Sequence, residues 1–481
     1  MSKLNRREFV KKTGAASTVF AAFTVAGTKS SRQVLGANDR IRVGVAGING
    51  RGTSHIGGFA PMDGVEVSYL IDPDTRLFES RTKMVQDKGG NTPTCVQDIR
   101  EALDDKNLDV VTVATCNHWH SLITIWACQA GKDVYVEKPI SHNLFEGRKC
   151  VEAAAKYDRI VQHGTQNRSS QGKANEIAAV QSGKYGKLLV SKGYCCKPRW
   201  SIGHKPLTTP PRELDWDLWL GPAPKQDYHG NLHTYNWHWF WDTGNGDTGN
   251  QGVHEMDIAR WAIKDSTLPK RIWSVGGRYV PDEKDQGETP NMQVSVYEYE
   301  DAILLFETRG LVGKSGAPDR MVSNEYYTTD GVIKGGKFYA QGSDQGESLS
   351  VEGAPVTPGG AFGSFIQAVR SRKQEEINCD AEVAHYSSAL CHLANISYRL
   401  GKQDSLLKEE NPYNDNETIK DSLGMLKYNL KAVEIDLAEN TYSIGRDLKF
   451  DPVKEQFIGD KQADTMLTRP YRAPYVVPEQ V

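Results

Sequence analysis

A glycine-rich turn is the first feature of the sequence that could do chemistry. The segment Gly47-Ile48-Asn49-Gly50-Arg51-Gly52 follows the apolar run 41–46. Glycines let the backbone approach a pyrophosphate, and a helix that starts there directs unpaired N–H groups at the anion. An asparagine stands where such turns usually have their central glycine, and asparagine tolerates left-handed backbone. We therefore predict that a dinucleotide binds at Gly47, Asn49, Gly50, Arg51 and Gly52.

An acidic residue follows the second apolar run at the position where a ribose would bind. Asp72 comes directly after the run 65–71, 25 residues beyond Gly47. A carboxylate there can accept hydrogen bonds from ribose hydroxyls, and it would repel a 2′-phosphate. The cofactor is therefore predicted to be NAD rather than NADP. Arg76 is nearby and could stack on the adenine or contact a phosphate.

The elements that must position these residues alternate between strand and helix. Apolar runs at 41–46, 65–71, 108–114, 133–136 and 160–162 are separated by helical stretches at 98–103, 121–130 and 144–157. This order predicts an α/β domain with a doubly wound parallel sheet, residues 37–165. Residues 166–481 contain partly alternating strands and long loops. They are predicted to form an α+β domain with a large open, mainly antiparallel sheet and helices near 253–262 and 363–370.

The composition excludes several classes of protein. Hydrophobic residues make up 38% and charged residues 25%, and the net charge is −3 with no block of one sign. We expect a folded core, no nucleic-acid partner and no stable membrane insertion. The eight cysteines show no zinc-type spacing, and His118 and His120 lack a third ligand nearby, so no metal is expected. A disulfide is left open.

The N-terminus resembles an export signal. The charged segment Asn5-Arg6-Arg7-Glu8-Phe9 precedes the apolar run 15–27, which is short for a membrane span. The paired arginines indicate a twin-arginine signal and a periplasmic protein, with residues 1–36 as signal and linker. An ordinary secretory signal or a basic surface helix is the alternative.

Several motifs follow the strands in an order that resembles one family. Thr115-x-Asn117-x-x-His120 follows the third apolar run, and the segment 131–139 ends in Glu137-Lys138-Pro139. The later segments 215–222, Asp-Trp-Asp-Leu-Trp-Leu-Gly-Pro, and 250–257, Asn-Gln-Gly-Val-His-Glu-Met-Asp, complete the pattern. Over roughly residues 40 to 430, the chain resembles the Gfo/Idh/MocA oxidoreductases.

The resemblance implies a function and assigns roles to residues. It implies hydride transfer between NAD and a secondary hydroxyl of a sugar or a related compound. Lys138 would hydrogen-bond the reacting hydroxyl, His254 would exchange its proton, and Asp257 would orient His254 or contact the sugar. A homo-oligomer, a dimer or tetramer, is implied as well. Further cofactor contacts are expected from Thr115, Asn117, His120, Glu137, Lys138 and Asn167, and substrate contacts from Arg168, Tyr194, Lys197, Arg199, Trp237 and His254.

One departure and three alternatives remain open. Family dehydrogenases often have an aspartate where this chain has Asn250, which cannot accept a proton. More of the proton transfer would then fall to Lys138 and His254. The chain could be a sugar or glycoside dehydrogenase whose cofactor stays tightly bound. It could also be an NAD-dependent glycosidase of the α-N-acetylgalactosaminidase type, or a non-catalytic sugar-binding protein. For Arg168 an interdomain salt bridge is the alternative role.

Overall fold

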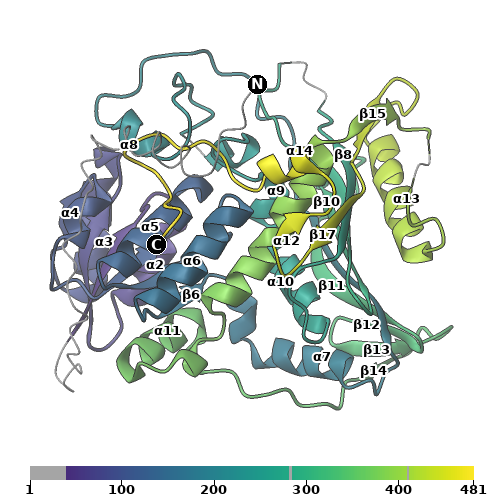
Figure 1. Ribbon diagram of the computed structural model, residues 1–481, viewed down its shortest axis with the longest axis horizontal. Helices are drawn as coiled ribbons and strands as arrows, with labels where there is room; N and C mark the ends of the chain where they lie inside the picture. The colour runs from purple at the N-terminus through teal and green to yellow at the C-terminus, as the bar shows by residue number, and fades with distance from the viewer. Residues whose placement is uncertain (1–39, 234, 281–283, 409–410) are drawn as a thin grey trace, which may run out of the picture.

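The computed structural model describes residues 40–233, 235–280, 284–408 and 411–481 (Figure 1). The predicted export signal lies outside the described residues. The first domain contains a six-stranded parallel sheet in the order β3-β2-β1-β4-β5-β6. This is the doubly wound arrangement expected from the sequence. Its elements are β1 Ile41–Ala46, α2 Gly52–Phe59, β2 Val65–Ile71, η1 Thr75–Leu77, α3 Phe78–Gly89, β3 Thr94–Val96, α4 Ile99–Leu103, β4 Val110–Val113, α5 Asn117–Gln129, β5 Asp133–Val136, α6 Leu144–Lys156 and β6 Val161–His163.

The second domain contains a twelve-stranded mixed sheet in which only β7 and β10 pair in parallel among the described strands. This confirms the predicted, mainly antiparallel sheet. Its elements are η2 Gln166–Ser169, α7 Gln171–Gln181, β7 Leu188–Cys196, α8 Trp216–Leu220, η3 Tyr235–Trp239, α9 Gly246–Asn250, α10 Gly252–Ala262, β8 Arg271–Gly277, β9 Met292–Glu298, β10 Ile303–Arg309, β11 Met321–Thr328, β12 Gly331–Lys334, β13 Lys337–Ala340, β14 Gly346–Ser348, α11 Gly360–Ser371, η4 Gln374–Glu376, α12 Ala381–Arg399, β15 Lys402–Ser405, α13 Glu417–Ala432, β16 Thr441–Ile444, β17 Leu448–Asp451, β18 Gln456–Phe457 and α14 Lys461–Thr465.

Helices separate the two sheets. In Figure 1, α6, α10 and α12 lie between the parallel sheet and the large sheet, and α13 covers part of the outer face of the large sheet. Helix α12 packs on α6 of the first domain and on β8 of the second. Helix α12 therefore belongs to the interface between the two domains.

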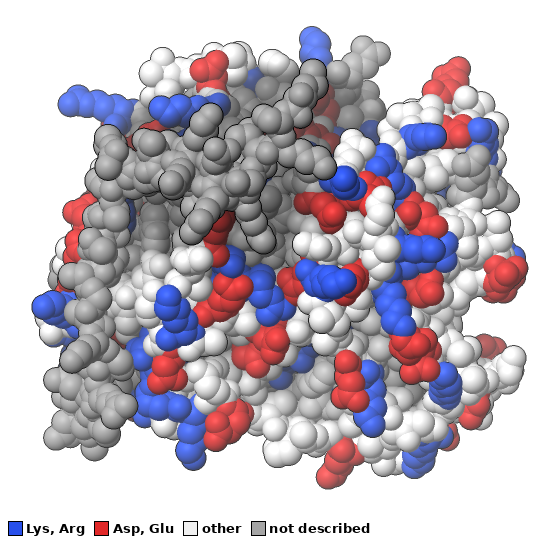
Figure 2. Space-filling view, viewed as in Figure 1, with Lys and Arg blue, Asp and Glu red and all other residues white. Residues whose placement is uncertain are grey.

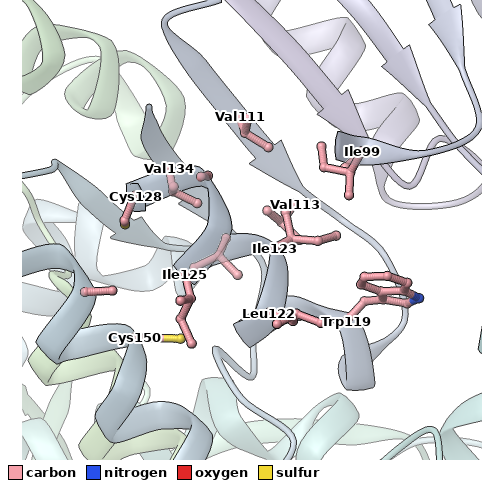
Figure 3. Close-up of a cluster of buried hydrophobic side chains, with 14 of the residues drawn as sticks. Ile99, Val111, Val113, Trp119, Leu122, Ile123, Ile125, Cys128, Val134 and Cys150 are labelled. Carbon is pink, nitrogen blue, oxygen red and sulfur yellow. The ribbon is translucent and has the colours of Figure 1, made fainter. Parts of the chain in front are cut away.

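The core of the first domain is made from residues that the parallel strands bury on both faces. Figure 3 shows Val111 and Val113 of β4 beside Leu122 and Ile125 of α5. Each of these side chains is at most 1% exposed. Burial of one such side chain stabilises the fold by about 1.5–3 kcal/mol. This packing fixes the start of α5 at the cavity described below.

Two distant segments complete the first domain. The end of the chain packs on its core through Tyr475, Val477 and Val481, and Figure 1 shows this segment running from α14 back to α5. Helix α11 packs on the other side of the sheet through Phe365 and Ile366. The polar stretch after residue 449, which has no sequence pattern, therefore has a structural role.

The surface carries no field of one sign on the side seen in Figure 2, where acidic and basic side chains are interspersed. Among the described residues, no helix combines the length and the hydrophobicity that a membrane crossing needs.

Candidate active site

A cavity of about 430 Å³ lies at the carboxyl ends of the parallel strands. Open α/β sheets bind ligands at this edge. One side is formed by the turn after β1, the ends of β2, β4 and β5, and the start of α5. The other side comes from the second domain. The lining includes twelve of the residues predicted from the sequence: Gly47, Asn49, Gly50, Arg51, Asp72, Thr115, Asn117, His120, Glu137, Lys138, Trp237 and His254.

The glycine turn has the tight backbone that the sequence predicts. Gly47 has φ +80°, and a Cβ there would lie 2.6 Å from the backbone nitrogen of Thr115. A Cβ on Gly52 would lie 1.9 Å from the carbonyl oxygen of Gly47, so this position also requires glycine. Gly52 does not line the cavity. Its lack of a side chain shapes the turn, and because α2 begins at Gly52 the predicted cofactor contact through its backbone N–H stays a prediction.

The carboxylate of Asp72 supports the same turn. It accepts hydrogen bonds from the backbone N–H groups of Ile48 at 2.9 Å and Asp74 at 3.0 Å. Burial raises the pKa of Asp72 to about 6, against the lowering effect of these hydrogen bonds. Arg76 forms a two-pronged ion pair with Asp74, at 2.7 and 2.6 Å, and does not line the cavity. The ion pair holds the guanidinium beside Asp74, and the predicted contact of Arg76 with the cofactor stays a prediction.

Glu137 connects the end of β5 to the glycine turn. Its Oε1 accepts a hydrogen bond from Arg51 Nε at 2.8 Å and lies 3.2 Å from His55 Nε2. Burial opposes the charge of Glu137, but His55, Arg51 and Lys138 outweigh it and hold the pKa well below its usual range. His120 has a similar bracing position, with ring nitrogens 2.6 Å from the Pro139 carbonyl oxygen and 3.0 Å from that of Thr115.

Lys138 and His254 meet at the deep end of the cavity. The Lys138 ammonium donates a hydrogen bond to the backbone carbonyl of Asn250, at the end of α9. Burial lowers the pKa of Lys138. Burial and then the nearby Lys138 charge lower the pKa of His254 to about 3, so this imidazole is neutral at physiological pH. The pair therefore combines the hydrogen-bond donor of Lys138 with a neutral imidazole.

Five of the residues predicted to act on or contact the substrate lie outside the cavity lining: Arg168, Tyr194, Lys197, Arg199 and Asp257. Arg168 and Asp257 pair with each other at 2.9 Å, and Ser387 also donates to Asp257 at 2.6 Å. Asp257 is therefore held by Arg168 rather than paired with His254. The salt bridge of Arg168 lies within the second domain, so it is not the interdomain salt bridge that was the alternative. Arg199 pairs with Asp247 at 2.8 Å, the ammonium of Lys197 binds Gln251, and the Tyr194 hydroxyl donates to Glu325 at 3.2 Å.

Asn167 belongs to η2 and does not line the cavity, whereas its neighbour Gln166 does. The Gln166 amide donates to Glu137 Oε1 at 3.3 Å. The predicted contact of Asn167 with the cofactor stays a prediction.

A strap from the second domain, residues 211–233 and 235–241, closes the cavity. Its backbone bonds to the segment after β2, where Thr75 N donates to Glu213 O at 3.0 Å and Asp215 N donates to Pro73 O at 2.9 Å. His233 Nε2 lies 3.5 Å from Asp74 Oδ2. These contacts hold the second domain across the end of β2, over the place where the first domain would hold a nucleotide.

The strap contributes lining residues that the sequence analysis missed: Leu218, Trp219, His233 and Tyr235. Trp219 stacks on Trp216 with ring centroids 4.7 Å apart. Asn250 and Gln251 also line the cavity. The signal that could have found them was present, because the segment rich in tryptophan, proline and glycine precedes the motif that contains His254. All eight cysteines are free, so the structure contains no disulfide.

The fold and the site define the class of the protein as an oxidoreductase with a dinucleotide-binding domain. A model described as the oxidoreductase family with an NAD-binding Rossmann fold matches residues 41–165. The model for the C-terminal α/β domain of the same family matches residues 179–431 and 429–477. These matches cover most of the chain, which belongs to the Gfo/Idh/MocA oxidoreductase family.

The curated relatives are proteins named glycosyl hydrolase family 109. The one from Shewanella pealeana is 25% identical over 218 residues, which are 42% of this chain and 48% of the relative. A second, from Shewanella sp. strain ANA-3, is 26% identical over 257 residues, which are 48% of this chain and 53% of the relative. The chain thus spans about half the length of the curated relatives it matches.

Solved structures show the same fold at low identity. The WlbA dehydrogenase from Bordetella pertussis, in complex with NADH and UDP-GlcNAcA, has a TM-score of 0.53 and 17% identity over 74% of this chain and 96% of that one. Levoglucosan dehydrogenase, in complex with NADH and levoglucosan, has a TM-score of 0.51 and 17% identity over 74% and 97%. At this identity the likeness establishes the fold.

The cavity residues fit an NAD molecule. Asn117 is 1% exposed, lines the cavity, and its Oδ1 has no hydrogen-bond partner among the described residues. A buried acceptor of this kind normally requires a partner, and a bound cofactor would supply one. A Cβ on Gly50 would meet nothing within 4 Å, so the turn leaves open space on its cavity side. No described side chain caps the start of α2, which leaves its N-terminus available to a phosphate.

Proposed function

We propose that this protein is an NAD-dependent oxidoreductase that acts on a secondary hydroxyl of a sugar or glycoside. The observation that carries the proposal is the pairing of Lys138 and His254 at the deep end of the cavity that also contains the glycine turn. Bound NAD would take a hydride from the carbon that bears the hydroxyl, or its reduced form would return one.

His254 and Lys138 have different roles at the oxygen atom of the reacting hydroxyl. His254 is the proposed acceptor of the hydroxyl proton during oxidation, because its imidazole is neutral and lines the cavity together with Lys138. Its low pKa in the protein without ligands makes it a weak base there. The Lys138 ammonium donates a hydrogen bond to the same oxygen and stabilises the negative charge that develops there. Asn250 holds this ammonium through its backbone carbonyl. The amide side chain of Asn250 is therefore not required as a base.

The walls of the substrate end favour a sugar. Trp237 lines the cavity together with the amides of Asn250 and Gln251, which neighbour Lys138 and His254. Indole rings pack on the apolar face of a sugar ring, and amides both donate and accept hydrogen bonds with its hydroxyls. The complexes of two similar folds with a nucleotide sugar and with levoglucosan agree with this class of substrate.

A redox glycosidase is the second candidate, because the curated relatives carry a glycosyl hydrolase name. Such an enzyme oxidises a glycoside transiently, eliminates the aglycone, adds water and reduces the product, so that NAD is unchanged at the end. The strap across the end of β2 suits either a glycosidase or a dehydrogenase that keeps its cofactor. Retention also fits the proposal that the N-terminal segment directs export, since a periplasmic enzyme would need to carry its NAD.

The test combines cofactor and product analysis. Protein purified without added nucleotide is denatured, and the released NAD is quantified by mass spectrometry against the protein. The native protein is then incubated with a panel of glycosides. A keto-sugar identifies a dehydrogenase, and free aglycone with no net NADH identifies a redox glycosidase. Failure to bind NAD, even when it is added, would contradict both candidates.

A further inference from the structure

Tyr235 is an aromatic side chain that is exposed at the cavity. It starts η3 in the strap, lines the cavity, and is 59% exposed. His238 supports the ring, with centroids 4.7 Å apart and planes at 58°. A ring nitrogen of His238 also lies 2.6 Å from the Tyr235 carbonyl oxygen. The histidine thus holds one side of the tyrosine, and the rest of the ring faces solvent at the mouth of the cavity.

One residue connects this mouth to the reacting end. The side-chain amide of Asn250 donates a hydrogen bond to the Tyr235 hydroxyl at 2.7 Å, and the backbone carbonyl of Asn250 accepts one from Lys138. The phenol acts as the acceptor in its bond with Asn250, so its own O–H can donate to a ligand. The exposed tyrosine and the buried lysine are therefore both bonded to Asn250, one at its side chain and one at its backbone.

We propose that Tyr235 determines specificity by binding the group attached to the reacting sugar, so that the substrate is a glycoside rather than a free monosaccharide. This inference rests on the proposed function. A sugar whose hydroxyl reaches Lys138 fills the deep end, and a substituent on it must extend toward the mouth. There the Tyr235 ring offers a flat surface to a second sugar or an aryl aglycone, and its O–H offers a hydrogen-bond donor. A free monosaccharide would leave this surface in contact with water.

The experiment compares Tyr235→Ala and Tyr235→Phe with the wild type. Each protein is measured on two ligands that share the reacting sugar, a methyl glycoside and the matching disaccharide or aryl glycoside. KM is measured for turnover, and Kd is measured by calorimetry. Tyr235→Ala should weaken the binding of the larger ligand about two- to tenfold more than the binding of the methyl glycoside, because only the larger ligand reaches the ring. Tyr235→Phe keeps the ring and should retain most of this difference in affinity.

Tyr428→Ala is the matched control. Tyr428 lies on α13, is 60% exposed, and does not line the cavity. Its substitution should leave the KM and Kd of both ligands unchanged. If Tyr235→Ala weakens both ligands equally, or neither, the inference is wrong even if the wild type is active. If the wild type turns over neither ligand, the proposed reaction fails, and the calorimetric comparison still tests the role of Tyr235.

Discussion

Two sets of charged residues at the domain junction differ in what they can do. Lys138 is in the cavity wall, beside an uncharged imidazole and a backbone carbonyl. Arg168 and Asp257 are behind the wall, where each neutralises the other. Residue type and motif position did not separate the two sets. The difference lies in the partner, because a charge already paired in the interior stabilises the fold and is not available to a substrate.

The largest expected effect is the loss of kcat when Lys138, the residue in the cavity wall, is replaced. Lys138→Met should lower kcat by about 10²- to 10⁴-fold, because it removes the hydrogen-bond donor and the positive charge at the reacting oxygen. NAD content and the melting temperature should remain close to those of the wild type. Steady-state kinetics on the substrate found in the glycoside panel checks the rate, and mass spectrometry checks the cofactor.

Lys83→Met is the control for the loss of a lysine, since Lys83 is exposed on α3 and forms only a surface pair with Asp87. It should be fully active. A Lys138→Met variant that keeps more than about a tenth of the wild-type rate would remove Lys138 from the chemistry, since general acid–base contributions are larger than that.

Substitution in the ion pair of Arg168 and Asp257 should lower the stability of the protein and leave kcat nearly unchanged. Asp257→Asn leaves the Arg168 guanidinium buried and uncompensated, and should lower the free energy of unfolding by about 3–5 kcal/mol. In the wild type, burial opposes the charge of Asp257, but Arg168 outweighs it and lowers the pKa of the carboxyl. Chemical denaturation measures the loss. At a temperature where the variant is folded, kcat should stay within a few-fold of wild type.

The double variant Arg168→Met with Asp257→Asn sharpens this test. It removes both charges and should recover part of the stability that Asp257→Asn loses. If Asp257→Asn instead abolished turnover while the protein kept its stability, Asp257 would act on the substrate as the sequence suggested, and the contrast between the two sets would be lost.

The glycine turn allows a second comparison, between a glycine that the fold of the turn requires and a glycine that leaves space for the cofactor. A Cβ on Gly52 would overlap the Gly47 carbonyl oxygen, whereas one on Gly50 would meet nothing within 4 Å. Gly52→Ala should therefore destabilise the protein without cofactor by roughly 2–4 kcal/mol. Gly50→Ala should keep its stability and weaken NAD binding, because its methyl group points into the open space. Thermal unfolding without NAD and calorimetric titration with NAD separate the two effects, and equal losses of stability would contradict the assignment.

The sequence predicted the first domain well because its signals are local. The bounds of β1 and β2 match the apolar runs that predicted them. Helix α3 and strand β3 were not predicted, because α3 buries only Val85 and β3 has no fully buried residue. Their positions depend on the neighbouring strand, which periodicity does not report.

The substrate half of the site could be predicted only in part. His254 and Trp237 were found from a motif and a loop composition, and both line the cavity. Tyr235 was not found, because its place at the mouth depends on how the strap bonds to the segment after β2. Lys197 and Arg199 were predicted to contact the substrate. Their partners in the structure, Gln251 and Asp247, are set by the three-dimensional fold, and residue type alone does not reveal them.

The smallest expected effect concerns the protonation of His254 in the cavity wall. It appears in the dependence of the unfolding free energy on pH. The folded-state pKa of His254, about 3, lies below its ordinary value of 6.5. As pH falls below 6.5, the unfolded chain binds a proton that the folded protein does not, so stability decreases down to about pH 3. One such group contributes up to about 1.4 kcal/mol per pH unit. His254→Asn should reduce the slope of unfolding free energy against pH by up to this amount between pH 6 and 4, whereas substitution of the exposed His204 by Asn should not. An unchanged slope in His254→Asn would mean that the imidazole titrates in the folded protein as it does in the unfolded chain, so that burial beside Lys138 does not hold it neutral as pH falls.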